Sequence, residues 1–437
     1  MVAGGLLCGL PAPLLARERP PDILLVTIDT LRADRLSAYG YGRPTSPHLD
    51  ALLASGVRFA QARTVEPLTG PALTSMLTSL ESHEHAATRN GLRMRTGIPS
   101  LPKLLAQGPY DTAAIVGNWT LRDKLSGLSE HFGSYEEVLS RKRWMGLFKG
   151  EATGEDLTQA AVAWLHRHRQ ERGSRPYLLW VHYVEPHAPY RLQEGFARRL
   201  GVPVAESATK SDRYDTEIAF VDHQVSLLLA AARGDGPSNL MVVLAADHGE
   251  SLGEHGYWGH GRNLYEPNLR IPMGISWPGH VPAGLVITAP AMITDLAPTV
   301  LGLLGLTVPS AVHGYNWAPV LAGQAEPPAD RVTTFQAHKG AVLSGEGKNA
   351  RANGLLEVAV VAAGKKEIFR LGNNARRLFD LAVAPVERTP VSSTPKASPQ
   401  LLAWLEKVRQ GLKAMGDLPA EIDPESIEQL KALGYIE

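Results

Sequence analysis

Cysteine is nearly absent from this chain, which has one cysteine, Cys8, among 437 residues. A single cysteine forms no intrachain disulfide and no thiolate metal cluster. An excess of either charge is also missing, because 44 Lys and Arg residues balance 44 Asp and Glu residues. This balance argues against a nucleic-acid partner, which would need a basic surface, and against an acidic tail for a basic partner.

Long apolar runs are missing as well. Beyond the N-terminus, no run of the sequence is long enough to cross a bilayer. Residues 1–20 contain the weakly apolar stretch MVAGGLLCGLPAPLLA, which ends near small residues. No Lys or Arg precedes this stretch, and Pro11 and Pro13 interrupt it, yet its composition favours a signal or leader segment. We therefore expect export to the periplasm or the cell exterior, with a cytoplasmic location as the alternative.

Four short apolar runs predict buried parallel strands, at residues 22–29, 112–118, 177–183 and 239–249. Three helical patterns lie between them, PHLDALLASGVRF, GEDLTQAAVAWLHRHRQ and DTEIAFVDHQVSLLLAAA. The alternation predicts an α/β fold, with a mostly parallel central sheet and helices on both faces. The chain length suggests two or three domains. We expect this sheet to form a catalytic domain over residues 21–325.

The pattern changes after about residue 325. The segment LLEVAVVAAGKKEIFRLGNNARRLFDL predicts strands joined by turns, and so a small antiparallel sheet. The following VERTPVSSTPKASPQ is typical of a loop. The final IDPESIEQLKALGY predicts a terminal helix, with Asp423 at its cap, Pro424 in its first turn and Gly434 at its stop. Residues 326–437 are thus predicted to form a C-terminal subdomain.

The stretch VEPLTGPALTSMLTSL, residues 65–80, predicts a helix that begins near Pro71. Thr69 would lie just ahead of that helix. Its hydroxyl could cap free backbone N–H groups, which is the common role of such a residue. It could also be a nucleophile, whose alkoxide the positive end of the helix dipole would stabilise. The local sequence leaves both interpretations open.

Polar groups follow three of the four predicted strands. An Asp at one strand end is commonly a turn or cap residue, but the carboxyl ends of strands in one sheet share one crevice. The groups that could bind a metal or move a proton there are Asp29, Thr30, His182, Glu185, His187, Asp247 and His248.

The loop DHGESLGEHGYWGHG adds His255 and His260 to His248, together with five glycines. Such a loop lets backbone approach something small and charged. Solvated histidines in a flexible loop are the alternative.

Several segments resemble one known family. PDILLVTIDTLRADRLSAYGY resembles the opening of the sulfatases, within the alkaline-phosphatase-like superfamily, and DHGESLGEHGYWGHGRNLYEPNLRIPM resembles their second signature. VHYVEPHAPY, ITDLAPTVLGLLGL, HGYNWAPVLAG and RRLFDLAVAPVE match in the same order, and the tail is similar to that of bacterial members. The resemblance covers about residues 21–437. It implies the alkaline-phosphatase-like fold and the hydrolysis of an ester, with a small-molecule or glycan ester as the substrate.

The resemblance also implies a metal site. Asp29, Asp247 and His248 would bind one divalent ion, with Thr69 as a further ligand at the nucleophile position. Two carboxylates and an imidazole favour Mn or Zn over Ca, with Mg as a further option. Such an ion lowers the pKa of a bound hydroxyl and neutralises the group that is transferred.

Three further residues receive roles from the resemblance. His187 and His260 would contact the anionic oxygens of the ester or its leaving group, as catalytic and substrate-binding residues. His260 stands where many members of the family have a lysine. Asn90 matches a polar, substrate-binding position that lines the same pocket.

The nucleophile position departs from the family pattern. Most sulfatases have Cys or Ser there, in a C/S-x-P-x-R pattern, and oxidise it to formylglycine. This chain has Thr69, whose oxidation would give a ketone, and Leu73 replaces the arginine. We therefore expect no formylglycine. A second departure is Thr30, which stands where many sulfatases have another Asp ligand.

Three hypotheses follow from these departures. The first is a metal-dependent hydrolase of phosphate or phosphonate esters in which Thr69 attacks, as in the phosphodiesterases and phospho-group transferases of the superfamily. The second is a sulfuric ester hydrolase that acts without formylglycine. The third is a weakened member that binds an anionic ester or glycan without turnover, because Ala72 and Leu73 leave the nucleophile with less support.

Overall fold

The computed structural model describes residues 19–143, 148–234, 238–342, 353–383, 387–392 and 396–415, and residue 428. The predicted leader segment, apart from its last two residues, and the predicted terminal helix, apart from residue 428, lie outside these ranges. Within these ranges, no helix is both long and apolar enough to cross a bilayer.

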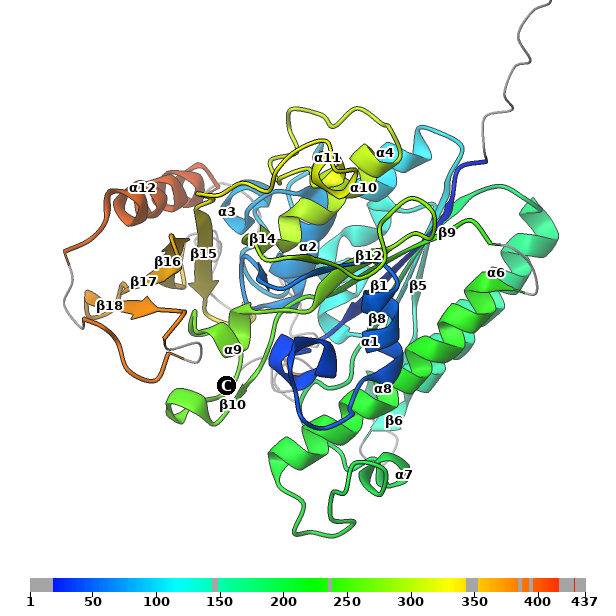
Figure 1. Ribbon diagram of the computed structural model, residues 1–437, viewed down its shortest axis with the longest axis horizontal. Coiled ribbons are helices and arrows are strands. Elements are labelled where there is room, and N and C mark those ends of the chain that lie inside the picture. The colour runs from blue at the N-terminus through cyan, green and yellow to red at the C-terminus, as the bar shows by residue number, and fades with distance from the viewer. Residues whose placement is uncertain are drawn as a thin grey trace, which may run out of the picture.

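The centre of the fold is a sheet that has eight strands within the described residues, in the order β13-β2-β12-β9-β1-β8-β4-β5 (Figure 1). β1 pairs in parallel with both β8 and β9, and β4 pairs in parallel with β8 and β5. β12 is antiparallel to β9 and β2. The four predicted strands are thus confirmed as β1, β4, β8 and β9. The bounds are β1 Asp22–Ile28, β2 Val57–Phe59, β4 Asp111–Val116, β5 Ser134–Glu137, β8 Tyr177–Tyr183, β9 Leu240–Ala246, β12 Met273–Ser276 and β13 Leu285–Ile287.

Helices cover both faces of this sheet, as predicted. The long helices α6 and α8 lie together with α1 on one face, and α2, α4 and α10 lie on the other (Figure 1). Covering both faces explains why β8 and β9 are buried along their whole length. The helix bounds are α1 Pro47–Ala54, α2 Thr69–Thr78, α3 Ser82–His85, α4 Leu101–Ala106, α5 Asp123–Ser126, α6 Gly154–Arg172, α7 Glu194–Ala197, α8 Lys210–Arg233, α9 Glu266–Leu269, α10 Leu296–Leu303, α11 Ala318–Leu321 and α12 Pro399–Ala414.

Three pairs of short strands complete the main domain. β10 and β11 close the loop that follows β9, β3 pairs with β14, and β6 pairs with β7. Their bounds are β3 Ala62–Arg63, β6 Leu139–Arg143, β7 Phe148–Glu151, β10 Ser251–Leu252, β11 Trp258–Gly259 and β14 Ala291–Met292.

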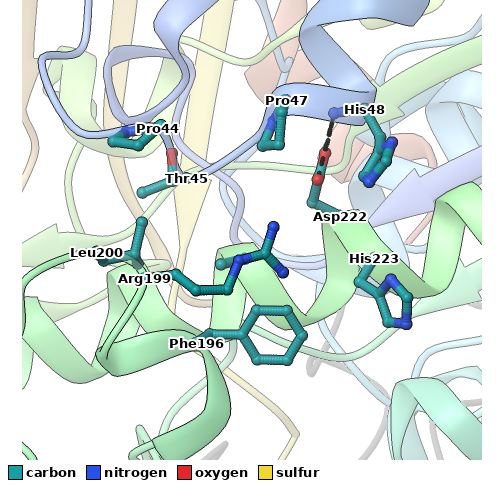
Figure 2. Close-up of a pocket in the computed structure, with 10 residues that line it drawn as sticks. Pro44, Thr45, Pro47, His48, Phe196, Arg199, Leu200, Asp222 and His223 are labelled. Carbon is teal, nitrogen blue, oxygen red and sulfur yellow. Dashed lines mark hydrogen bonds between the residues drawn. The ribbon is translucent and has the colours of Figure 1, made fainter.

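A polar contact joins α1 to α8 at a small surface pocket. Asp222 of α8 accepts hydrogen bonds from the backbone N–H groups of His48 and Leu49, at 3.0 and 2.8 Å (Figure 2). These N–H groups belong to the first turn of α1, where a carboxylate is favourable. Arg199 and His223 line the same pocket. The pocket lies between helices and not at the strand ends, so Asp222 serves the attachment of α1.

The C-terminal region forms the predicted antiparallel sheet, in the order β15-β16-β17-β18. Alternate residues of β16 face opposite layers, as the period of a strand requires. Ala359 and Val361 join the main hydrophobic core, while Val358 and Val360 pack with residues of α12. The bounds are β15 Thr333–His338, β16 Leu355–Ala362, β17 Lys365–Arg370 and β18 Ala375–Asp380.

The helix α12 covers the outer face of this sheet (Figure 1). Trp404 of α12 donates from Nε1 to the carbonyl oxygen of Phe335 at 2.8 Å. The sequence analysis predicted no helix here, and the loop predicted over residues 386–400 ends at the first turn of α12. The predicted boundary between the two domains, at residue 325, stays a prediction.

A buried cluster of four charged residues joins the C-terminal sheet to the main domain. Glu266 lies 2.9 Å from Nε of Arg63 and 3.0 Å from Nζ of Lys366, which is fully buried on β17. Nζ of Lys366 also lies 3.1 Å from Oε1 of Glu387. A carboxylate oxygen of Glu387, Oε2, accepts a hydrogen bond from the backbone N–H of Glu266. Each charge in the cluster therefore has an opposite charge beside it, as burial requires.

Candidate active site

The carboxyl ends of β1, β8 and β9 meet at one point, because β1 lies between the other two strands. Ile28 is paired with Tyr183 of β8 and with Ala246 of β9. The next residues on the first and third of these strands are Asp29 and Asp247, and both are fully buried. The polar strand ends of the sequence analysis are thus brought together at the position where open α/β sheets bind ligands.

His248 and Thr69 join these carboxylates. Nε2 of His248 lies 3.3 Å from Oδ2 of Asp247 and 3.9 Å from Oδ1 of Asp29. Oγ1 of Thr69 lies 3.4 Å from the same Nε2. All four residues are fully buried. Donor atoms about 2.1 Å from one ion lie roughly 3 to 4 Å from each other, so these separations suit one metal ion.

The helix α2 begins at Thr69, whereas the sequence analysis predicted a start near Pro71 with Thr69 just ahead of the helix. Its N-cap residue is Leu68, in an extended conformation and without a side-chain capping hydrogen bond, while Oδ1 of Asn90 accepts from the backbone N–H of Gly70 in the first turn. The capping interpretation of Thr69 is therefore not seen. The hydroxyl instead faces His248, at the positive end of the helix dipole.

The chemistry of His248 and Asp247 fits a cation between them. Nδ1 of His248 lies 2.9 Å from the carbonyl oxygen of Gly249, which can only accept, so Nδ1 carries the proton. Burial, followed by the charge of His260, lowers the pKa of His248 well below its usual value, so Nε2 presents a lone pair. That lone pair faces a buried carboxylate oxygen of Asp247 that has no hydrogen-bond partner in the described part of the chain. Two electron-rich atoms face each other favourably only across a positive charge.

Nearby donors contact both of the adjacent buried carboxylates, Asp29 and Asp247. Asn118, which follows β4, donates from Nδ2 to Oδ2 of Asp29. Oδ1 of Asp247 accepts from the backbone N–H groups of Thr30 and His248, at 3.1 and 2.7 Å. Burial raises the pKa of Asp247, and the charge of His182 opposes this rise. The sequence analysis missed Asn118 because it placed that residue inside a predicted strand.

A second histidine lies against the two carboxylates. His182 of β8 is fully buried, and one of its ring nitrogens lies within 4.8 Å of carboxylate oxygens of both Asp29 and Asp247. The sequence analysis named His182 as a group that could bind a metal and gave it no place among the predicted ligands.

His187 and His260 form the outer side of the site. The ring centre of His260 lies 4.4 Å from that of His248 and 5.2 Å from that of His187. Nδ1 of His187 lies 2.8 Å from the carbonyl oxygen of Ala188, so that nitrogen carries a proton.

Glu250 orients His260, and the sequence analysis did not single it out. Oε1 of Glu250 lies 3.0 Å from Nδ1 of His260, and Glu250 is fully buried. Burial alone would raise the pKa of Glu250, but the charge and hydrogen bond of His260, with the charges of His187 and His248, lower it. Glu250 is therefore ionised and can only accept, so Nδ1 of His260 donates to it and Nε2 is directed away from Glu250.

Asn90 lies beside the start of α2. Its Oδ1 accepts from the backbone N–H of Gly70 at 2.9 Å, directly after Thr69. Its backbone carbonyl accepts from the N–H of Val342, from the segment after β15. Its Nδ2 is buried and has no hydrogen-bond partner among the residues that the structure describes. Asn90 thus holds the start of α2 in place and offers a donor at Nδ2.

Two residues of the predicted set lie elsewhere. Glu185 accepts from the backbone N–H of Gly154, at the start of α6, with distances of 3.0 and 3.2 Å. His255 stacks on Tyr265, with ring centres 3.6 Å apart. Both polar groups therefore belong to the surrounding structure.

Comparison with known proteins agrees with this architecture. The family model described as Sulfatase matches residues 21–306. An N-acetylglucosamine-6-O-sulfatase of Bacteroides thetaiotaomicron is 25% identical over 417 residues, with 73% of this chain and 74% of the relative covered.

Two solved structures share the fold. A protein in complex with its substrate D-glucosamine-2-N,6-O-disulfate matches with a TM-score of 0.71 and 20% identity, over 92% of this chain and 100% of the other. A phosphonate monoester hydrolase of Agrobacterium radiobacter matches with a TM-score of 0.69 and 19% identity, over 91% of this chain and 96% of the other.

Proposed function

The chain belongs to the sulfatase family and is an ester hydrolase, and from this premise we propose a metal-dependent hydrolase of phosphate or phosphonate esters that uses Thr69 as its nucleophile. The observation that carries the proposal is the buried hydroxyl of Thr69, 3.4 Å from Nε2 of His248 at the start of α2. Asp29, Asp247, His248 and Thr69 would hold one divalent ion. When bound, that ion would lower the pKa of the hydroxyl and neutralise charge on the transferred group.

The reaction would proceed in two steps. Oγ1 of Thr69, after losing its proton to solvent, would attack phosphorus, the bond to the alcohol would break, and the alcohol oxygen would take a proton from His260 or His187. Water would then attack phosphorus and give a proton back to that histidine, and the phosphate or phosphonate would leave as Thr69 regains its proton from solvent. The positive end of α2 and the amide of Asn90 would stabilise charge on the other oxygens in both steps.

Glu250 would keep His260 ready for proton transfer. The ionised carboxylate of Glu250 accepts from Nδ1 of His260 and would direct Nε2 towards the ester. In this proposal, His260 takes the place of the lysine that the sequence analysis noted in many family members.

The sequence of α2 supports a reaction without formylglycine. Thr69 cannot give the aldehyde, and Leu73, at the position of the family arginine, belongs to the hydrophobic core. A sulfuric ester hydrolase with the same threonine is the second candidate, because the Bacteroides relative is named as a sulfatase. A weakened protein that binds an anionic ester or glycan is the third.

We also propose that the protein is exported, since residues 1–20 have the composition of a leader segment. A small-molecule or glycan ester is the proposed substrate, in keeping with the amino-sugar sulfate in the name of the Bacteroides relative.

A panel of substrates tests the proposal. Purified protein would be assayed on sulfate esters, phosphate monoesters, phosphodiesters and phosphonate monoesters, with metal content measured in parallel. We expect turnover of a phosphorus ester and about one divalent ion per chain. Turnover of sulfate esters alone would favour the second candidate, and tight anion binding without turnover would favour the third.

A further inference from the structure

We propose that His182 is a ligand of the metal ion, through Nε2, in addition to Asp29, Asp247, His248 and Thr69. This inference rests on the metal site of the proposed function and changes its chemistry. The ligand set would contain two imidazoles, two carboxylates and one hydroxyl.

The register of the sheet places His182 at the site. In the parallel pair of β1 and β8, His182 lies opposite Thr27, two residues before Asp29. The ring is fully buried, and its Nε2 lies 3.8 Å from Oδ2 of Asp29. His182, Asp29 and Asp247 each offer an atom within 4.8 Å of the other two, which is the spacing of atoms around a common ion.

A chain of hydrogen bonds fixes the other ring nitrogen. Nδ1 of His182 lies 2.8 Å from Oγ1 of Thr27, and Nε1 of Trp180 donates to the same oxygen at 2.8 Å. A hydroxyl oxygen has two lone pairs and can accept from both groups. In the tautomer that we propose, Nδ1 of His182 donates to Thr27, and the lone pair of Nε2 is directed towards the carboxylates. Histidine ligands are commonly oriented in this way by an acceptor at the second nitrogen.

The second imidazole affects the choice of metal. Calcium and magnesium are bound mainly by oxygen atoms, whereas imidazole suits zinc and other transition metals. A site with two buried imidazoles should therefore prefer zinc or manganese to calcium. The ligand set predicted from the sequence has one imidazole, so its preference for zinc or manganese over calcium should be weaker.

The test measures metal affinity and the spectrum of the cobalt-substituted protein, so its readout does not depend on activity. Zinc affinity of full-length His182→Ala should fall by at least about 100-fold, because loss of a ligand should exceed the 10–100-fold effect of an outer partner. The visible absorption of Co²⁺ should change as one imidazole leaves the ion. Thr27→Val, which removes only the partner of Nδ1, should weaken zinc binding about 10–100-fold. His131→Ala is the matched control, since His131 is a buried histidine that is bonded to Ser100.

Wild-type zinc affinity and an unchanged cobalt spectrum in His182→Ala would overturn the proposal, and would leave His182 as a hydrogen-bond donor to Asp29. His182→Gln and Thr27→Val keep the test decisive if the alanine variant does not fold. Asp247→Ala separates the two proposals. If it loses the metal while His182→Ala retains it, only this inference fails; if both variants retain the metal, the metal site of the proposed function fails as well.

Discussion

Replacing Lys366 by Met should destabilise the protein by removing one cation from the buried cluster that joins the two sheets. Nζ of Lys366 contacts Glu266 and Glu387 at 3.0 and 3.1 Å, and the side chain is fully buried. Glu266 retains Arg63 in the variant. Glu387 retains the backbone N–H of Glu266 but loses the cation 3.1 Å from its Oε1, so its charge is the one that loses its ion pair.

The structure sets the size of this effect and its dependence on pH. Leaving one buried charge unpaired costs about 3–5 kcal/mol. Burial raises the pKa of Glu387 to about 7, although the charge of Lys366 opposes the rise. Because the folded-state pKa is raised, protonation stabilises the fold at low pH, and this contribution is lost as pH rises through the folded pKa. Lys366→Met should therefore cost more at pH 8 than at pH 5.

Urea unfolding followed by tryptophan fluorescence would measure the effect at both pH values. Lys365→Met is the matched control, because Lys365 is the exposed neighbour on the same strand, and it should stay within about 0.5 kcal/mol of the wild type. The double variant Lys366→Met/Glu387→Gln should recover part of the loss at pH 8. If Lys366→Met behaves like the control at both pH values, the cluster does not hold the C-terminal sheet in the way described.

Two further predictions concern single carboxyl groups. Glu250→Gln should keep the metal but lower kcat by about 100-fold, because the ionised acceptor that orients His260 for proton transfer is lost; an unchanged kcat in steady-state assays would contradict this. Burial, with the nearby charge of Glu84, raises the pKa of Glu81 to about 8. Because the folded-state pKa is raised, the stability that neutral Glu81 contributes is fully present below about pH 4.5. This stability is lost as the pH rises through about 8. The thermal midpoint of Glu81→Gln should therefore fall less between pH 5 and 9 than that of the wild type or of the exposed control Glu130→Gln. An equal fall in all three proteins would refute this prediction.

Much of the fold could be predicted from the sequence, because buried parallel strands are short apolar runs and amphipathic helices have a clear period. The helix α12 shows the limit. Leu401, Trp404, Leu405 and Val408 have helical spacing and are buried, but the Ser, Thr and Pro residues before them indicated a loop. The helical spacing was present in the sequence. Because the loop was extended to residue 400, the helix start at Pro399 was not recognised.

The candidate site shows a different limit. Asp29, Asp247 and His248 end strands or belong to a strong motif, so the sequence indicated them directly. The roles of His182 and Glu250 depend on which strand lies beside which and on which loop folds back. Periodicity along one segment carries no information about the neighbour of β1, so the contact between His182 and Asp29 needed the structure.

Covalent attack by Thr69 is the central claim, and mass spectrometry of the quenched enzyme tests it most directly. Wild-type protein would be mixed with the best phosphorus ester from the panel, quenched in acid during turnover and digested. The account predicts a phosphoryl or phosphonyl adduct on the peptide that contains Thr69, some retained activity in Thr69→Ser, and neither adduct nor turnover in Thr69→Ala. Turnover by Thr69→Ala at the wild-type rate, without an adduct in either protein, would contradict the account.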